Sequence, residues 1–112
     1  MTLAEKTITV LASAGLDARK PANYVGGCKS PYIVVQDAGA QPIGKSTCRR
    51  TVVLYGYAPY NQPALLADML ATAKAVMAAM PALRLTMASE ETVDDACKAL
   101  TANLTYTALC AK

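Results

Sequence analysis

One stretch of the chain has the spacing of a phosphate-binding loop. Residues Gly39 to Ser46 read GAQPIGKS and fit the pattern G-x-x-x-x-G-K-[ST], in which backbone amides and a lysine surround nucleotide phosphates. That chemistry requires a helix directly after the motif, because the phosphates sit at the helix N-terminus. The next residues read TCRRTVVLY, whose β-branching and period of two predict a strand instead. We interpret the motif as a hairpin tip, and nucleotide binding through Gly39 to Ser46 stays an alternative that a helix after Ser46 would reveal.

The other residue types that carry chemistry are sparse in this chain. Histidine is absent, which removes the commonest general base and the commonest metal ligand. The four cysteines form no C-x2-C pair of the kind that begins a zinc site, so we interpret each as a small buried hydrophobe: Cys28, Cys48, Cys97 and Cys110. These observations predict a protein that is not an enzyme, with no catalytic residues, no cofactor and no metal site.

The even number of cysteines would also suit disulfides in a secreted protein. Ala12-Ser13-Ala14 has the residue types of a signal-peptide cleavage site, but the apolar run before it covers only Ile8 to Leu11 and follows Glu5. We therefore expect a cytoplasmic site of synthesis with reduced thiols. No stretch approaches the roughly 20 apolar residues of a membrane-spanning helix, so we expect no membrane contact.

Two clusters of opposite charge are candidate partner-binding residues. The basic cluster consists of Lys45, Arg49 and Arg50. The acidic cluster consists of Glu90, Glu91, Asp94 and Asp95. Charged clusters are usually solvated surface, yet opposite charges can set the register between two protein surfaces. The net charge of +3 is well below that of a typical nucleic-acid-binding domain.

The length and composition predict one domain that covers residues 1–112. A chain of 112 residues with 54% hydrophobic and 17% charged residues can bury one core. Thr2 and Glu5 have the spacing of a capping box, which predicts a first helix over residues 3–13 that stops at Gly15. A second helix is predicted from Pro63 to Pro81, because its apolar residues follow helical spacing: Leu66, Met69, Leu70, Ala73, Val76, Met77 and Met80. We expect its methionines to fill the core rather than to line a partner groove.

Four segments have the pattern of β-strands. Residues 31–36 are rich in residue types that favour β-strands. The side chains of residues 47–57 alternate between two sets, one for each face of a strand, and those of residues 83–87 do so weakly. Residues 100–108 alternate with a strict period of two. The segment from Leu16 to Ser30 reads as an irregular connection, and the acidic cluster as a turn. The resulting order is α-β-β-α-β-β: an α+β domain with a mostly antiparallel sheet and both helices on one face. The opposite face is predicted to be rich in threonine.

This pattern resembles the small tail-terminator, or tail-completion, proteins of long-tailed bacteriophages, which join the tail to the head. Four segments carry the resemblance: the strand PYIVVQD at 31–37, the strand RRTVVLY at 49–55, the alanine-rich helix 63–81 and the closing strand 100–108. The resemblance extends over nearly the full chain and rests on the order of the elements and on their general residue pattern. It therefore assigns no functional residue of the family to a position in this sequence.

The resemblance implies a structural virion protein located in the tail or neck and made in the host cytoplasm. It implies a homo-oligomeric ring, commonly a hexamer, that contacts the tail-tube protein on one side and a head-completion or connector protein on the other. DNA would pass through the lumen, with only non-specific contact. Two further alternatives stay open beside the nucleotide-binding protein: another phage neck, connector or tail protein, and a small monomeric regulator that binds one partner protein.

Overall fold

The fold is α+β: in the described part of the chain, two helices cover one face of a six-stranded, mostly antiparallel sheet. The computed structural model describes residues 3–19, 31–59, 61–80, 83–89, 92–94 and 99–111. Along the chain, the elements are α1 (Leu3–Ser13), β1 (Ala18–Arg19), β2 (Tyr32–Pro42), β3 (Thr47–Pro59), α2 (Pro63–Ala78), β4 (Leu83–Ala88), β5 (Thr92–Asp94) and β6 (Ala99–Ala111).

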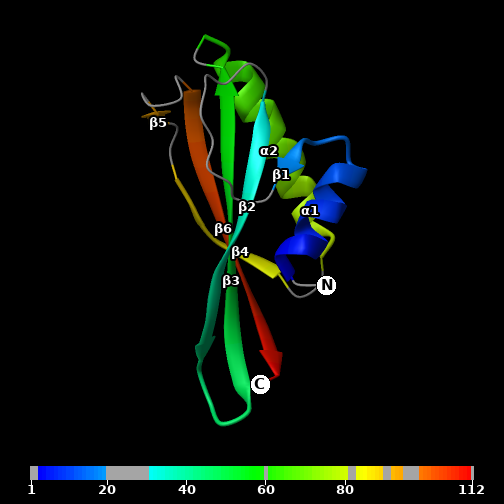
Figure 1. Cartoon of the computed structure of the whole chain (residues 1–112), viewed down its shortest axis with the longest axis vertical. Coiled ribbons are helices and arrows are strands. Elements are labelled where there is room, and N and C mark those ends of the chain that lie inside the picture. The colour runs from blue at the N-terminus through cyan, green and yellow to red at the C-terminus, as the bar shows by residue number, and fades with distance from the viewer. Residues whose placement is uncertain are drawn as a thin grey trace.

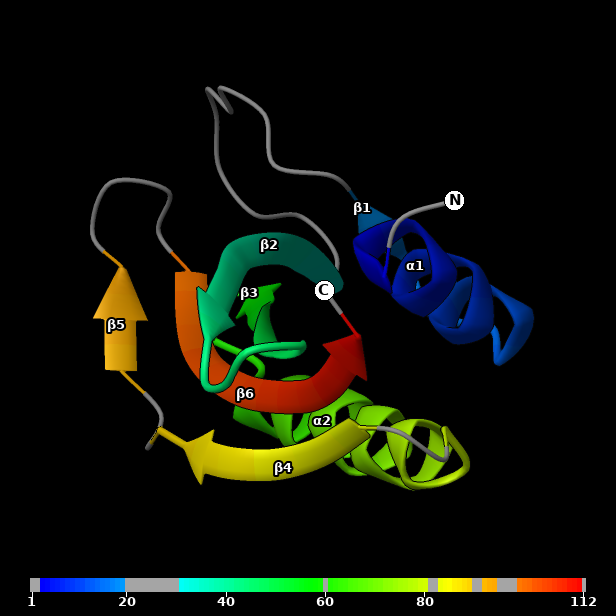
Figure 2. The same cartoon turned by 90° about the horizontal axis from the view of Figure 1, so that it is seen from below.

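The sheet is built around two strands of 13 residues each, β3 and β6. The strand order is β1-β2-β3-β6-β4, and β5 pairs with β6 beside β4. Only the short pairing of β1 with β2 is parallel among the described strands. The sheet is strongly twisted and coiled, as the view from below shows (Figure 2), and the molecule is elongated, with extents of 48 × 25 × 25 Å (Figure 1).

The core lies between the two helices and the face of the sheet that carries the even-numbered residues of β3 and β6. Leu54, Leu104 and Leu66 are almost fully buried in it, and Met69 and Met77 are also buried. The methionines of α2 therefore fill the core, as predicted. Their flexible thioether side chains adapt well to the irregular gap between a helix and a twisted sheet.

The close approach of α2 to the sheet depends on Gly56 in β3. A Cβ atom at this position would lie 2.9 Å from Leu70 Cδ2, 3.2 Å from Leu66 Cδ1 and 3.3 Å from Met69 Cε. The three side chains of α2 thus occupy the space that any larger residue at position 56 would need.

The first helix ends as its sequence predicts. Gly15 has a φ of +86°, its N–H donates to the carbonyl of Ala12 (3.0 Å), and the N–H of Leu16 donates to the carbonyl of Leu11 (3.1 Å). This is the Schellman arrangement, in which a left-handed glycine satisfies the last free carbonyl groups of a helix. Thr2, the first residue of the predicted capping box, lies outside the described residues.

The strands differ from the prediction mainly in their lengths. β2 continues through Asp37, Gly39 and Pro42, which were predicted to form a loop, so that residues 43–46 alone connect β2 to β3. β6 extends three residues past Ala108. Residues 92–94 of the predicted acidic turn form β5, because they pair with residues 99–101 of β6. α2 ends at Ala78, three residues before Pro81.

Candidate functional site

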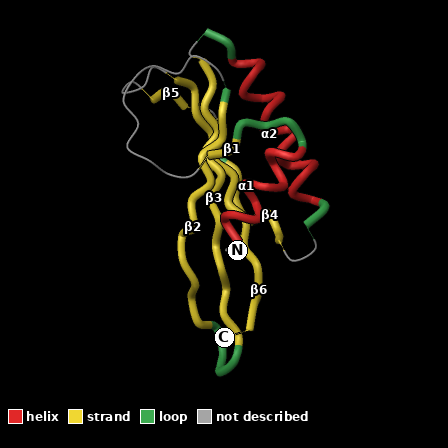
Figure 3. Tube along the Cα trace, turned by 45° about the vertical axis from the view of Figure 1, so that its right-hand side comes forward, coloured by secondary structure: helices red, strands yellow, loops and turns green. Residues whose placement is uncertain are grey.

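Three strands project beyond the helices as an arm, here defined as residues 37–51 and 107–111. It consists of the second half of β2, the connection to β3, the first part of β3 and the end of β6. Figures 1 and 3 show the outer part of this arm at the lower end of the molecule, below both helices, while α1 reaches down to the level of its base. Because its outer part extends past the described helices, the arm can present backbone and side chains to another molecule there, although Cys48 and Ala108 are buried.

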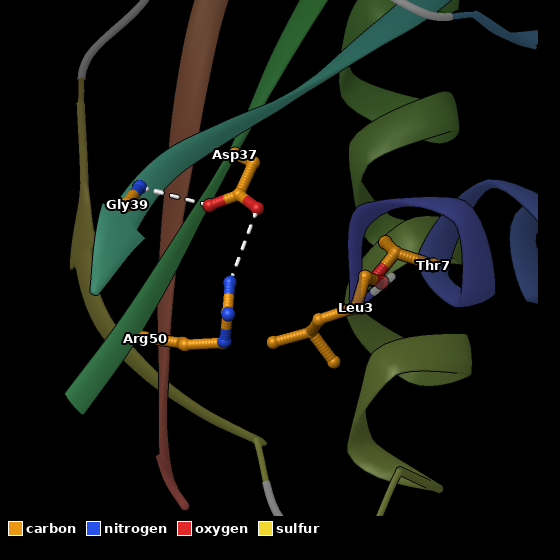
Figure 4. Close-up of polar contacts among 5 residues, drawn as sticks. All are labelled: Leu3, Thr7, Asp37, Gly39 and Arg50. Atoms are coloured by element: carbon orange, nitrogen blue, oxygen red, sulfur yellow. Dashed lines mark hydrogen bonds and ion pairs between the residues drawn. The ribbon is translucent and has the colours of Figure 1, made fainter. Parts of the chain in front are cut away.

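A β-bulge between Asp37 and Ala40 shapes the base of the arm. The strand register shifts there, since Asp37 pairs with Val52 but Ala40 pairs with Arg50. Gly39 takes a φ of +95° and donates its N–H to Asp37 Oδ1 (2.8 Å), while Arg50 Nη1 donates to Asp37 Oδ2 (3.4 Å) (Figure 4). The carboxylate of Asp37 therefore holds the bulged strand to its neighbour, at a type of site where bulges commonly redirect a strand.

The structure separates the three residues of the basic cluster. Lys45 lies in the exposed connection between β2 and β3. Arg49 and Arg50 are consecutive in a strand, so their side chains project from opposite faces of the sheet. Arg50 forms an ion pair with Asp37, whereas Arg49 is exposed beside Leu109 on the face away from the helices. Lys45 and Arg49 are therefore the two members of the cluster best placed to meet a partner.

Most of the acidic cluster lies outside the described residues. This applies to Glu90, Glu91 and Asp95. The backbone of Asp94 belongs to β5, where it pairs with Ala99. Within the described part of the chain, Asp37 forms an ion pair with Arg50 of the basic cluster. Asp37 was not predicted as a site residue. The sequence does contain a signal for Asp37, the pattern Asp-x-Gly. In this pattern the short aspartate side chain can accept a hydrogen bond from the backbone N–H two residues later.

Apolar side chains that the sequence analysis did not single out are exposed on the arm and along one edge of the sheet. On the arm, Ile43 is 46% exposed and Leu109 is 62% exposed. Along the edge formed by β4 and β5, Leu85 is 44%, Met87 67% and Val93 51% exposed. Leu109 could have been found by continuing the period of two in β6 past Ala108. The arm thus combines exposed basic and apolar residues.

Two edges of the sheet have backbone with no described strand beside it. β1 pairs only with Ile33 and Val34 of β2, so the rest of β2 has no described strand on its outer side. On the opposite side of the sheet, β4 and β5 have β6 as their only described neighbour. Unpaired edges present N–H and C=O groups that another strand can use for hydrogen bonds.

A compact cluster of aromatic and charged side chains lies where β1 pairs with the start of β2. Tyr32 and Tyr57 stack with 5.1 Å between ring centroids, and the guanidinium of Arg19 lies 4.5 Å from the centroid of the Tyr32 ring. Arg19 also donates two hydrogen bonds to Asp17, at 2.7 and 3.0 Å, and these hold the pKa of Asp17 below its usual value. Tyr32 is 5% exposed, so this cluster fastens β1 to the sheet.

The phosphate-loop pattern lies in the arm, not at the start of a helix. Gly39 to Pro42 belong to β2, and Ser46 is followed directly by β3, as predicted. The helix N-terminus that nucleotide phosphates require after Ser46 is therefore replaced by a strand. Among the described residues, no three or more histidine, cysteine, aspartate or glutamate side chains are grouped in a way that could hold a metal ion.

No helix within the described ranges is both long and apolar enough to cross a membrane. Comparison of the chain with models of known protein families gives no match, and comparison with curated proteins gives none either.

Proposed function

We propose that this chain is a structural assembly subunit, a tail-terminator or tail-completion protein that forms a ring between the tail tube and the head connector of a bacteriophage. The single observation that supports this most strongly is the arm, an extension of β2, β3 and β6 whose outer part lies beyond the described helices. Together with the element order and the sequence resemblance, it favours a protein whose surfaces serve contact with neighbours.

The shape of the arm fits a ring contact. A closed ring needs heterologous contacts, in which one surface of a subunit meets a different surface of the next. The arm supplies one such surface, with Ile43 and Leu109 exposed beside Lys45 and Arg49. The edge of β4 and β5, with Leu85 and Met87, supplies a second surface at a different place on the sheet. Apolar contacts would then provide affinity, and the basic residues would steer the arm to an acidic neighbour.

The experiment reverses the two exposed charges of the arm. Lys45→Glu with Arg49→Glu should leave the monomer folded, because exposed substitutions usually change stability by less than about 0.5 kcal/mol each. Lys74→Glu is the matched control, since Lys74 is exposed on α2, away from the arm. Arg50 is left unchanged because its contact with Asp37 belongs to the subunit itself.

Sedimentation velocity over a range of protein concentrations, alone and with assembled tail tubes, measures the outcome. The unmodified protein and the Lys74→Glu control should form one closed oligomer, and the arm variant should stay monomeric or fail to bind tubes. An unmodified protein that is monomeric under all these conditions would favour the alternative, a monomeric regulator that binds one partner. Normal rings formed by the arm variant would contradict the assignment of Lys45 and Arg49 to the interface.

A further inference from the structure

Two of the four cysteines, far apart in sequence, are direct neighbours in the sheet. Cys48 in β3 and Cys110 in β6 are partners in the antiparallel register. They form the second-to-last pair of this ladder, which ends with Thr47 and Ala111 at the end of the arm. Cys48 is 8% exposed and lies on the same face as Val52 and Leu54.

The hydrogen bonds around Asn103 show which kind of antiparallel pair the two cysteines form. The N–H of Ser89 donates to the carbonyl of Asn103 (2.9 Å), and the N–H of Asn103 donates to Ser89 Oγ (2.8 Å). The backbone polar groups of Asn103 therefore point away from β3. These groups alternate along a strand, so the even-numbered residues of β6, including Cys110, direct theirs toward β3.

Cys48 and Cys110 therefore occupy a hydrogen-bonded pair, in which the two Cα atoms are typically about 5.5 Å apart. This spacing is within the range of roughly 4.4 to 6.8 Å over which disulfides form. At such pairs, however, the Cβ atoms stand toward the wide end of the cross-strand range of about 4.5 to 5.5 Å, while a relaxed disulfide prefers about 3.8 Å. A disulfide here can form, but it must pull the two strands together locally, which makes it easier to reduce.

We propose that Cys48 and Cys110 are a redox-active pair that forms a reversible cross-strand disulfide and ties β6 to β3 at the end of the arm. The position near the end of a ladder allows access, because local opening costs least where pairing stops. The expectation of reduced thiols in the cytoplasm agrees with a bond that is readily reduced. The inference concerns the fold of one chain and does not depend on the proposed ring.

The reaction is a thiol–disulfide exchange with a low-molecular-weight disulfide such as oxidised glutathione. One cysteine of the pair loses its proton, and its thiolate attacks a sulfur of glutathione disulfide. A mixed disulfide forms, and one glutathione leaves as a thiolate that takes up a proton. The second cysteine, as a thiolate, then attacks the protein sulfur of the mixed disulfide and releases the second glutathione. The two protein thiols are oxidised by two electrons in total, and glutathione disulfide is reduced to two thiols.

The test incubates the folded full-length chain in glutathione buffers that range from fully reduced to fully oxidised, then blocks thiols with N-ethylmaleimide. Trypsin places each cysteine in a different peptide, with Cys48 in residues 46–49 and Cys110 in residues 99–112. We expect these two peptides to be joined within one chain in the oxidised buffers and separate in the reduced ones. The double variant Cys28→Ser with Cys97→Ser should retain the link, and Cys48→Ala should lose it.

Three results would overturn the proposal. The first is that the folded chain forms no disulfide between Cys48 and Cys110 in the most oxidised buffer. This result counts against the proposal even if the same disulfide forms in denaturant. The second is a preferred link of Cys48 or Cys110 to Cys28 or Cys97. The third is a link between the two expected peptides that survives excess reduced glutathione, which would contradict its reversibility.

Discussion

Replacing Gly56 with valine tests whether the contact of α2 with the sheet requires the absence of a side chain on β3. Three terminal atoms, of Leu70, Leu66 and Met69, lie within 3.3 Å of the place that a Cβ atom would occupy. Valine puts a branched three-carbon side chain into this space. Either the three side chains of α2 move out of their favoured rotamers, or the helix moves away from the sheet.

The magnitude follows from two opposing effects. Replacing glycine within a strand gains about 0.5 to 1 kcal/mol, because the unfolded chain loses conformational freedom. Overpacking costs about 1 to 3 kcal/mol. For alanine the two effects nearly cancel, since the three contact atoms are ends of flexible side chains. For valine we expect the upper end of the overpacking range and a net loss of about 2 kcal/mol, which lowers the Tm by about 8 °C.

Urea unfolding followed by circular dichroism measures this loss, and an unchanged m-value shows that the unfolding reaction is the same. Gly44→Val is the matched control, because Gly44 lies in an exposed connection and a Cβ atom added there would have no atom within 4 Å. Gly56→Val should cost less stability in a Leu70→Ala background than in the unmodified protein, since Leu70 Cδ2 is the nearest obstacle. A Gly56→Val protein as stable as the Gly44→Val control would refute the reasoning.

Three further predictions concern the arm and the core. Gly39→Ala should destabilise the protein by about 1 kcal/mol in urea unfolding, because its φ of +95° is unfavourable for alanine although no atom lies within 4 Å of the added methyl group; equal stability would contradict a need for glycine. Burial raises the pKa of Tyr106, so the unfolded chain ionises first and stability should fall as the pH rises above about 10. Tyr106→Phe should show a smaller fall above about pH 10, and an identical fall would assign the effect to other groups. Lys45→Ala should change stability by less than about 0.5 kcal/mol, and calorimetric titration should detect no magnesium-dependent binding of ATP or GTP, whereas micromolar binding would restore the phosphate-loop interpretation.

The sequence predicts most closely the elements whose residues follow one period without interruption. β6 alternates strictly, and the structure buries Leu100, Ala102 and Leu104 while Thr101 and Asn103 lie half-buried on the other face. The helix α1 has a matching stop signal at Gly15, and its predicted bounds are the observed ones. Periodicity and capping are local properties, so a single sequence can show them.

The length of β2 could not be read from local signals. Asp37, Gly39 and Pro42 are residues of turns, and a local reading assigns them to a loop. In the structure they continue the strand because β3 offers a long partner, and the bulge allows Gly39 to take its left-handed conformation inside a paired segment. Pairing between distant segments therefore overrides the local preference, as is common for strands.

The exposure of the charged candidate residues could be predicted in part. Lys45 and Arg49 are exposed on the arm, but Arg50 is separated from them by the alternation of the strand, which the sequence itself predicts for residues 47–57. The exposed Ile43, Leu85 and Met87 gave no signal, because single apolar residues outside a helix stripe are indistinguishable in sequence from core positions.

The ladder between β3 and β6 gives the domain a direction of mechanical strength. Its registered pairs run without interruption from Thr47 and Ala111 at the end of the arm to Pro59 and Ala99 at the opposite end of the sheet. A tensile load that pulls β3 and β6 apart along the strands acts on the cross-strand hydrogen bonds in shear, so that many bonds share it at once. A load that peels the end of β6 away sideways breaks the same bonds one after another. The protein should therefore resist stretching along its long axis far better than peeling at its C-terminal strand.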